Sequence, residues 1–334
     1  MQYIFMIMIT MKFGIIGLGN HAINRVMPAI KSSGNSITAI YSRAMKKAEK
    51  EGAAYGARAF SDLDEFFSRG DFDAVYIASP NFLHYEQARL SMENGRDVLL
   101  EKQMTLSNGD ASDLVGIATK TGRHLAVGFH MRFHPAIVEI RNIISSGKLG
   151  KITMVHGTWG GLSQGTSDNP DRRWWTEDEK VGGGSVMGTG VHVLDTINFL
   201  LGVRPDKISA FRQPAKAVID TTESISMEYG SIMAHAVSSR AMKHPRNDLA
   251  VYGTEATAVA RDVFSTTVNS DLEIDGKVTR TFRDGNMYED EVRAFVELVR
   301  GEKSRIATVK DGEVVVKTVN AAYLSDTTGK ITTL

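Results

Sequence analysis

A glutamate and a lysine stand together at the end of one apolar run of the sequence. The run DVLL covers residues 97–100, and Glu101 and Lys102 follow it directly. Such a run predicts a buried strand, so this charged pair is expected at the mouth of a sheet. There it indicates either a solvated loop or an active site in which the lysine transfers a proton.

A histidine and an aspartate form a second candidate pair in GGGSVMGTGVHVLD, residues 182–195. The three glycines precede a predicted helix, on which His192 and Asp195 are three residues apart and therefore share a face. His192 is a candidate acid–base residue, with a hydrogen-bonded core histidine as the alternative. Asp195 could orient His192, bind a substrate hydroxyl or cap the helix.

A glycine pattern near the start predicts a dinucleotide site. The apolar run KFGIIG leads into GLGNHA, in which Gly17, Gly19 and Ala22 fit G-x-G-x-x-G/A. Gly17 permits a tight turn, Gly19 lets the backbone approach a pyrophosphate, and Ala22 keeps the next helix close to the sheet. That helix, about residues 22–32, aims its amides at the phosphates. Asn20 and His21 are expected to contact the cofactor too.

The second predicted strand, SITAIYSR, ends without the acid that usually binds the ribose hydroxyls of NAD. Ser42, Arg43 and Lys47 stand there instead. A hydroxyl, a guanidinium and an ammonium can hold a 2′-phosphate by charge-assisted hydrogen bonds, which predicts NADP, with NAD possible. The alternative is a solvated, basic helix start.

Strand and helix patterns alternate up to residue 130, which predicts a parallel sheet with ligands beyond the carboxyl ends of its strands. After Gly128 comes a helical passage, followed by hairpin-like alternating strands and an apolar helical stripe that includes Phe295. The predicted fold class is α/β, in two domains. A Rossmann domain covers residues 11–130. A second α/β domain with an open, mostly antiparallel sheet covers residues 131–334 and is expected to bind substrate and to mediate oligomerisation.

The composition narrows the function. The 334 residues include 39 basic and 39 acidic side chains, so no net charge favours nucleic acid or an anionic membrane. There is no cysteine, which excludes disulfides and thiolate chemistry. No apolar run is long enough to span a bilayer. Residues 1–10 lack the features of a signal peptide and are interpreted as a dispensable extension before Met11, and the expected location is the cytoplasm.

Several spaced motifs resemble the family of glucose–fructose oxidoreductase, inositol dehydrogenase and the rhizopine-catabolism protein. They are GIIGLGNHA, IASPNFLHYEQA, DVLLEKQ, GFHMRFHPA, SGKLGKI, GGGSVMGTGVHVLD and YGTEAT. The resemblance implies a metal-free enzyme that packs into homodimers or homotetramers through the second sheet. It implies that Lys102 lies near the nicotinamide, where a cationic ring would lower its pKa, and that His192 bonds the reacting oxygen. It also implies cofactor contacts by Ser79, Asn81, His84 and Glu101.

Two residues depart from the family pattern close to the chemistry. Gly188 stands where many sugar-oxidising members carry an aspartate, four residues before the histidine. Gln103 stands where the family usually has a proline, often after a cis bond. Because a cis bond before glutamine costs about 3 kcal/mol, the turn is expected to be trans and reshaped.

Four further residues are candidates for the wall of a substrate pocket: Arg132, Arg173, Trp174 and Trp175. Aromatic faces stack on sugar rings, and an arginine can bind a phosphate or carboxylate. The two tryptophans could equally pack a lid. His130 and His134 have the spacing of helical metal ligands but lack a glutamate between them, so no metal is expected.

Together these features predict an NADP-dependent oxidoreductase of a sugar or polyol, with an aldose as the favoured substrate. Lys102, assisted by His192, is expected to relay the hydroxyl proton. Two alternatives remain open. One is a glycoside hydrolase of the same family that keeps its cofactor bound, and the other is a non-catalytic nucleotide-binding regulator.

Overall fold

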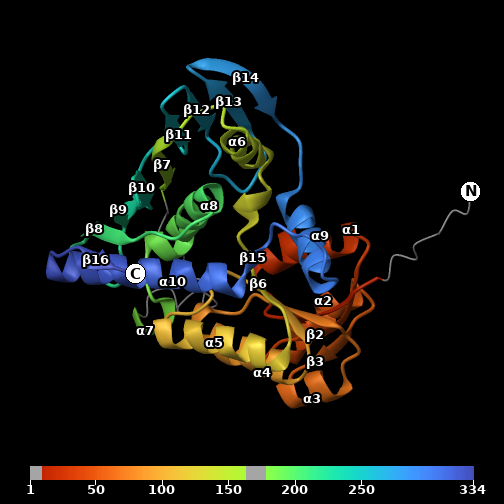
Figure 1. The fold of residues 1–334 in the computed structure, drawn as a ribbon. Coiled ribbons are helices and arrows are strands. Elements are labelled where there is room, and N and C mark those ends of the chain that lie inside the picture. Colours follow the sequence, from red (N-terminus) through yellow and green to blue (C-terminus); the bar gives the residue numbers. More distant parts are fainter. Residues whose placement is uncertain (1–9, 163–177) are drawn as a thin grey trace, which may run out of the picture.

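The fold is described from a computed structural model, for residues 10–162 and 178–334. The fold is built on two β-sheets. Helices pack on both faces of the first sheet and on one side of the second (Figure 1). The predicted fold class and the change from parallel to mostly antiparallel pairing are confirmed. None of the helices in these two ranges has the length and apolarity needed to cross a bilayer.

The first sheet has the strand order β15-β6-β5-β4-β1-β2-β3. All its strands are parallel except β15, which runs antiparallel to β6. Its strands are β1 (Lys12–Ile16), β2 (Ser36–Tyr41), β3 (Arg58–Phe60), β4 (Ala74–Ile77), β5 (Asp97–Leu100), β6 (Leu125–Val127) and β15 (Ala307–Thr308). The central strands β4, β5 and β6 are buried along their whole length, which explains why they read as continuous apolar runs.

Helices connect these strands where the sequence predicts them. They are η1 (Ala22–Val26), α1 (Met27–Ser32), α2 (Met45–Ala53), α3 (Leu63–Arg69), η2 (Asn81–Leu83), α4 (His84–Glu93) and α5 (Asn108–Thr121). Local capping fixes several starts: Asp62 accepts the Glu65 amide at 2.9 Å before α3, and Ser107 accepts the Asp110 amide at 3.0 Å before α5.

The second sheet has the order β14-β13-β12-β11-β7-β10-β9-β8-β16, and only β7 and β10 pair in parallel among these strands of the described ranges. Its strands are β7 (Ile152–Gly160), β8 (Lys207–Gln213), β9 (Thr222–Tyr229), β10 (Ile232–Ser239), β11 (Leu249–Gly253), β12 (Thr257–Arg261), β13 (Ser270–Ile274), β14 (Lys277–Phe282) and β16 (Thr332–Thr333). Helices η3 (His130–Phe133), α6 (Pro135–Ser145), α7 (Asp178–Val181), η5 (Val186–Gly190), α8 (Val191–Leu201), α9 (Met287–Val299) and α10 (Val309–Thr328) complete the fold.

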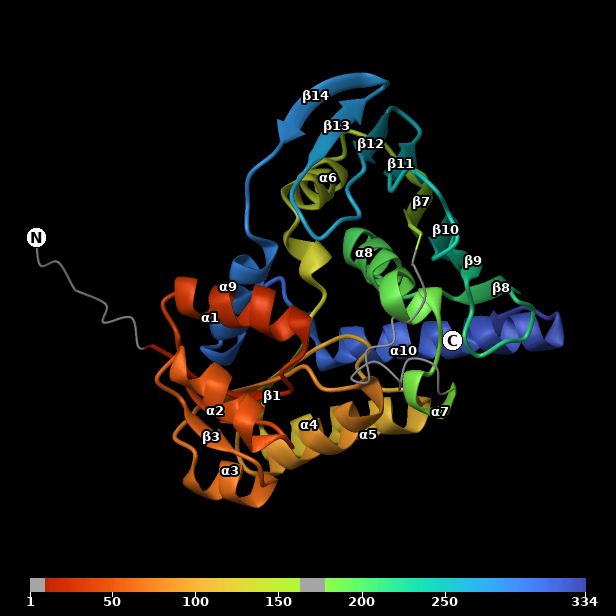
Figure 2. The same ribbon diagram turned by 180° about the vertical axis from the view of Figure 1, so that it is seen from behind.

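The last part of the chain returns to the first sheet. Helix α9 packs against α1, and its Phe295 ring lies 5.9 Å from that of Phe13 on β1. Strand β15 extends the sheet beside β6. Helix α10 then runs between the two layers, against α5 on one side and α8 and β8 on the other (Figures 1 and 2). The apolar stripe on α9 is thus buried against the first domain, and the division at residue 130 describes chain order better than packing.

Candidate active site

The turn after β1 is open to close approach by a ligand. Gly17 has a φ of 95°, and a Cβ there would lie 2.6 Å from the backbone of Ala78, so only glycine fits. A Cβ on the exposed Gly19 would meet no atom within 4 Å. Asn20 and His21 lead from it into η1. Strands β2 and β3 lie on one side of β1 and β4 to β6 on the other, so this turn lies where the strand order reverses.

The residues predicted to select NADP follow the next strand. Ser42 comes directly after β2, where its amide donates to the Phe60 carbonyl at 3.0 Å and its hydroxyl accepts the Ala44 amide at 3.3 Å. Arg43 is exposed, and Lys47 is half-buried on the first turn of α2. Ala22, the last residue of the glycine pattern, is buried at the start of η1. Ser42, Arg43 and Lys47 lie beyond the carboxyl end of β2, on the same side of the sheet as the glycine turn.

Lys102 leaves the carboxyl end of β5 and reaches across to the second domain. Its ammonium donates to the carbonyl of Gly188 at 2.7 Å and to that of Met187 at 3.3 Å, both in η5. Burial lowers the pKa of Lys102 against the opposing effect of Glu101. Many sugar-oxidising family members carry an aspartate at the position of Gly188. In this chain, Lys102 instead bonds the neutral carbonyls of Gly188 and Met187.

The expectation of a trans turn after Lys102 is wrong, because the Lys102–Gln103 peptide is cis. Gln103 occupies the position where the family usually has a proline, and its backbone carbonyl contacts a histidine. His84 Nδ1 lies 2.7 Å from the Gln103 carbonyl, and His84 Nε2 lies 2.9 Å from the Ser79 carbonyl. The Ser79 hydroxyl donates to Gln87 at 2.6 Å. His84 and Ser79 thus brace the turn that carries Lys102.

Asn81 begins η2 in this same loop and is half-buried. Its carbonyl accepts the amide of His84, which places it one turn from the bracing imidazole. Burial lowers the pKa of His84, and a neutral imidazole can donate to only one of its two carbonyl neighbours.

Glu101 is held as a carboxylate beside the glycine turn. Its Oε1 accepts the Tyr76 hydroxyl at 2.9 Å and lies 3.2 Å from His21 Nε2. Burial alone would raise the pKa of Glu101, but His21, Lys102 and Tyr76 outweigh it and lower the pKa to about 2. His21 and Glu101 were predicted separately as cofactor contacts, and the contact between them was not predicted.

His192 lies in a cluster of rings between the domains. Its imidazole is 4.6 Å from that of His130, 5.2 Å from the indole of Trp159 and 5.8 Å from Phe129, measured between ring centroids. Burial, followed by His130 and Lys102, lowers the pKa of His192 well below its ordinary value. His192 is therefore neutral near pH 7, and its buried Nδ1 has no hydrogen-bond partner among residues 10–162 and 178–334.

Asp195 and Arg132 bond to each other. The guanidinium donates from Nε to one carboxylate oxygen of Asp195 at 2.8 Å and from a terminal nitrogen to the other at 2.6 Å. The same nitrogen lies 3.2 Å from Asp311 on α10. Burial opposes the charge on Arg132, but the two carboxylates outweigh it and raise the pKa of Arg132 above its ordinary value. The sequence placed His192 and Asp195 on one helix face without revealing that Asp195 has its own partner.

Asp220, before β9, fixes the start of the helix that carries His192. Its carboxylate accepts the amides of Gly184 and Ser185, each at 2.8 Å, that of Val186 at 3.3 Å and the Ser185 hydroxyl. These are amides of the first turn, which have no partner within a helix. Asp220 is 35 residues away in sequence, so no local capping pattern indicates it.

Other predicted residues are not brought together here. Arg173, Trp174 and Trp175 lie outside the described residues. His134 accepts the Ala136 amide at 3.2 Å and caps α6. Within residues 10–162 and 178–334, no group of three or more histidines and acids is arranged to hold a metal ion. Trp159 and Tyr288, whose rings pack on His192 and His130, were not predicted.

The geometry defines a two-domain dinucleotide-binding protein with a lysine and a neutral histidine at the domain junction. Residues 11–129 match the model of an oxidoreductase family with an NAD-binding Rossmann fold, and residues 137–259 match the GFO/IDH/MocA C-terminal domain. The chain belongs to this oxidoreductase family.

Named relatives cover nearly the whole chain. D-xylose 1-dehydrogenase (NADP(+)) 2 of Haloferax volcanii is 29% identical over 96% of this chain and 98% of its own. The 1,5-anhydro-D-fructose reductase of Ensifer adhaerens is 25% identical over 96% and 97%. In fold, the chain is similar to the aldose-aldose oxidoreductase of Caulobacter crescentus, with a TM-score of 0.86, 21% identity and coverage of 97% and 100%.

Proposed function

We propose that this protein is an NADP-dependent oxidoreductase of a sugar or polyol, with an aldose as the favoured substrate. One observation carries the proposal: Lys102 from the first domain bonds the helix turn that precedes His192 in the second. An acid–base pair is thus held at the carboxyl ends of the parallel strands, beside the glycine turn.

The chain's own residues account for the proton. In the oxidation of an alcohol, the carbon loses a hydride and the oxygen loses a proton. NADP, when bound at the glycine turn, supplies the hydride acceptor. Lys102, in its uncharged form, takes the hydroxyl proton, and its ammonium donates hydrogen bonds to the carbonyls of Gly188 and Met187. Neutral His192 holds the reacting oxygen by a hydrogen bond. Reduction reverses these steps.

NADP preference is proposed from the end of β2. Ser42, Arg43 and Lys47 offer one hydroxyl and two cations where a carboxylate would repel a 2′-phosphate. Two relatives are named as NADP-dependent D-xylose 1-dehydrogenases, one from Haloferax volcanii and one from Haloarcula marismortui. Their names also support an aldose as the substrate.

Arg132 was predicted to line the substrate pocket, and Asp195 to orient His192, bind a substrate hydroxyl or cap the helix; we now propose a structural role for both. Each charge of the pair is satisfied within the protein, since Arg132 bonds both oxygens of Asp195 and also approaches Asp311. The pair links η3 to α8 and α10, so it holds the domain junction around the two reactive residues.

We also propose that copies of the chain associate through the open face of the second sheet. Large apolar side chains are exposed on several of its strands, including Met154, Phe211, Met233 and Tyr252. Burial of such a face in a homodimer or homotetramer would remove this surface from water. Light scattering on the purified protein tests the subunit count. The expected location in the cytoplasm stays a prediction.

The experiment that tests the function is NADPH formation by the purified protein on a panel of aldoses, polyols and sugar phosphates. NAD replaces NADP in one series, and Lys102→Met replaces the native chain in another. Turnover that favours NADP and is lost in the variant supports the proposal. Tight NADP binding with no turnover contradicts it. Release of sugar from a glycoside would then favour the hydrolase, and its absence would favour the regulator.

A further inference from the structure

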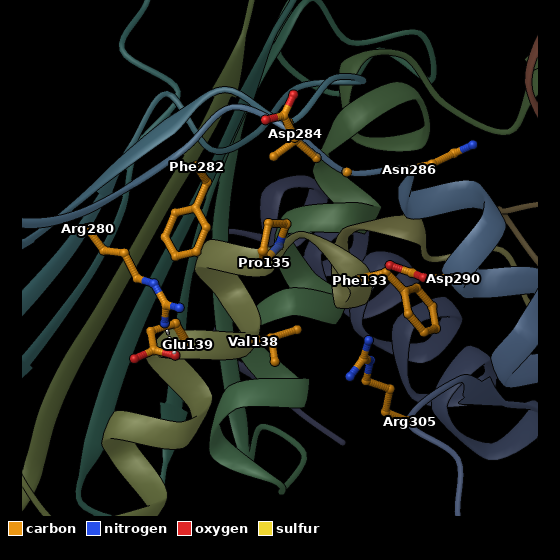
Figure 3. A pocket seen from close by; sticks show the side chains of 12 residues that line it. Phe133, Pro135, Val138, Glu139, Arg280, Phe282, Asp284, Asn286, Asp290 and Arg305 are labelled. Atoms are coloured by element: carbon orange, nitrogen blue, oxygen red, sulfur yellow. Dashed lines mark ion pairs between the residues drawn. The ribbon is translucent and has the colours of Figure 1, made fainter.

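Two surface cavities, each of about 330 Å³, lie near the second sheet. The first, drawn in Figure 3, lies between α6, β14 and the start of α9. Its Arg280 and Glu139 bond each other at 3.1 Å, and the guanidinium of Arg305 lies 5.1 Å from the ring centre of Phe133. None of the proposed active-site residues lines it. This cavity has no link to the chemistry.

The second cavity, here named the Trp159 cavity, adjoins the active site. It is lined by Trp159, Asn247, Asp262, Phe264, Ser265, Thr266 and Asn269. Five of these residues follow β12 in the connection to β13, which reaches toward α8 (Figure 2). Its volume lies at the small end of the range for ligand pockets, about 300–1,000 Å³.

Trp159 belongs both to this cavity and to the ring cluster at His192. Its indole stacks on Phe264 with 5.9 Å between ring centroids, and the same indole lies 5.2 Å from the His192 imidazole. Gly157 shares the face of β7 with Trp159, because side chains alternate along a strand. A Cβ on Gly157 would lie 2.7 Å from Val193 of α8 and 3.2 Å from Phe264. The cavity wall therefore packs directly on α8, the helix that carries His192.

The lining has the chemistry of a carbohydrate site. Its hydroxyl, amide and carboxylate groups can bond the hydroxyls of a sugar ring. The amide of Asn247 is fixed by two hydrogen bonds to the backbone of Gly160, at 2.8 and 3.2 Å, so this wall is already in place. Asp262 is the one charged side chain among the described lining residues, and it would repel a phosphate.

We propose that the Trp159 cavity is a subsite for the second sugar unit of a neutral disaccharide or longer oligosaccharide. The first unit would react at Lys102 and His192, on the other side of the Trp159 indole. This inference rests on the proposed function and narrows its substrate class, because a free monosaccharide would leave the subsite empty.

The test compares two exposed neighbours in the connection between β12 and β13. Thr266 lines the cavity, and Thr267 does not. Thr266→Trp should fill the cavity, while Thr267→Trp is the matched control for the bulk of the new side chain. Calorimetric titration in the presence of NADP measures the binding of maltose, cellobiose and xylobiose, each beside its monosaccharide, glucose or xylose. Turnover of the same sugars is measured in parallel.

We expect at least one disaccharide to bind about tenfold more tightly than its monosaccharide, equivalent to about 1.4 kcal/mol. Thr266→Trp should remove this advantage and leave the monosaccharide unaffected, and Thr267→Trp should keep it. Equal binding of every pair, no sugar binding at all, or the same response in both variants overturns the subsite. A disaccharide advantage without turnover would keep the subsite and reject the dehydrogenase. Turnover of monosaccharides without tighter binding of any disaccharide would reject the subsite and keep the dehydrogenase.

Discussion

The two groups of charged and polar side chains that meet at α8 differ in how well they are satisfied. Arg132 and Asp195 meet in a bidentate pair, with Asp311 beside them. Among the described residues, Lys102 donates hydrogen bonds only to neutral carbonyls of η5, with the Glu101 carboxylate nearby, and the buried Nδ1 of the neutral His192 has no hydrogen-bond partner. Both groups join the two domains. We propose that the satisfied group holds the junction, while the unsatisfied group is the one available for chemistry.

Removing the amine of the unsatisfied group should have the largest effect. Lys102→Met is expected to lower turnover about 10²- to 10⁴-fold, the usual contribution of a positioned acid–base residue, with NADP affinity unchanged. Initial rates and fluorescence titration of NADP measure the two quantities. Lys120→Met, which removes an exposed lysine on α5, is the matched control. Equal turnover in the two variants would remove Lys102 from the mechanism.

Breaking the satisfied group should cost stability instead. Asp195→Ala leaves the buried guanidinium of Arg132 without its main partner, so the free energy of unfolding should fall by about 3–5 kcal/mol. Replacing both residues, as Arg132→Met with Asp195→Leu, should restore much of this loss because the buried guanidinium is removed with its main partner, while Asp311 keeps its hydrogen bonds from Thr308. Urea unfolding measures both. A stable Asp195→Ala protein without turnover would reverse the comparison and make Asp195 a reactive residue.

Adding a carboxylate to the unsatisfied group should change its pH dependence. A Cβ on Gly188 would meet no atom within 4 Å, so Gly188→Asp can project into open space. The carboxylate would raise the pKa of Lys102, and the acid limb of the oxidation rate should move upward by about 1 to 3 pH units. Gly188→Ala has the same Cβ without the charge and should leave the limb in place. An unmoved limb in Gly188→Asp would mean that Lys102 is not the titrating base.

Asp220 tests whether the helix start positions both reactive residues. The Gly184 and Ser185 amides donate to different oxygens of its carboxylate, so Asp220→Asn must place an NH₂ against one of them. We expect turnover to fall about tenfold, or about 1.4 kcal/mol, with NADP affinity retained. Glu223→Gln is the control in the same buried cluster, because burial, then Asp220, raises the pKa of Glu223 and so favours its uncharged form. Similar losses in both variants would indicate a general packing effect.

His134 provides a comparison outside the candidate site, as an imidazole whose Nδ1 accepts the Ala136 amide. Burial lowers its pKa to about 4, below the ordinary 6.5, so the unfolded state takes up the proton first. Stability from this group is complete above pH 6.5 and should fall by up to about 1.4 kcal/mol per unit as the pH drops toward 4. His134→Asn keeps a capping oxygen and should remove this share of the slope. Unfolding at pH 7, 6 and 5 measures it, and an unchanged slope would assign the titration elsewhere.

Much of the fold could be read along the chain because its signals are local. Buried runs such as DVLL, the glycine turn at Gly17 and the alternation in the later strands each depend on neighbouring residues only, and each became the element that it predicts. The return of α9 and β15 to the first sheet left no such signal. The apolar stripe on α9 is visible in the sequence, but only the packed structure shows that the first domain covers it.

The sequence by itself determined the family, the two sheets and the positions of Lys102 and His192, because spacing along a strand or a helix decides where such residues can lie. Only the tertiary structure decided which charges are satisfied. The partners of Arg132, Glu101 and the first turn before α8 come from distant segments of the chain, such as Asp311 on α10 for Arg132. Hydrogen bonds and burial act through space, so whether a side chain is bound or reactive depends on neighbours that the order of residues does not reveal.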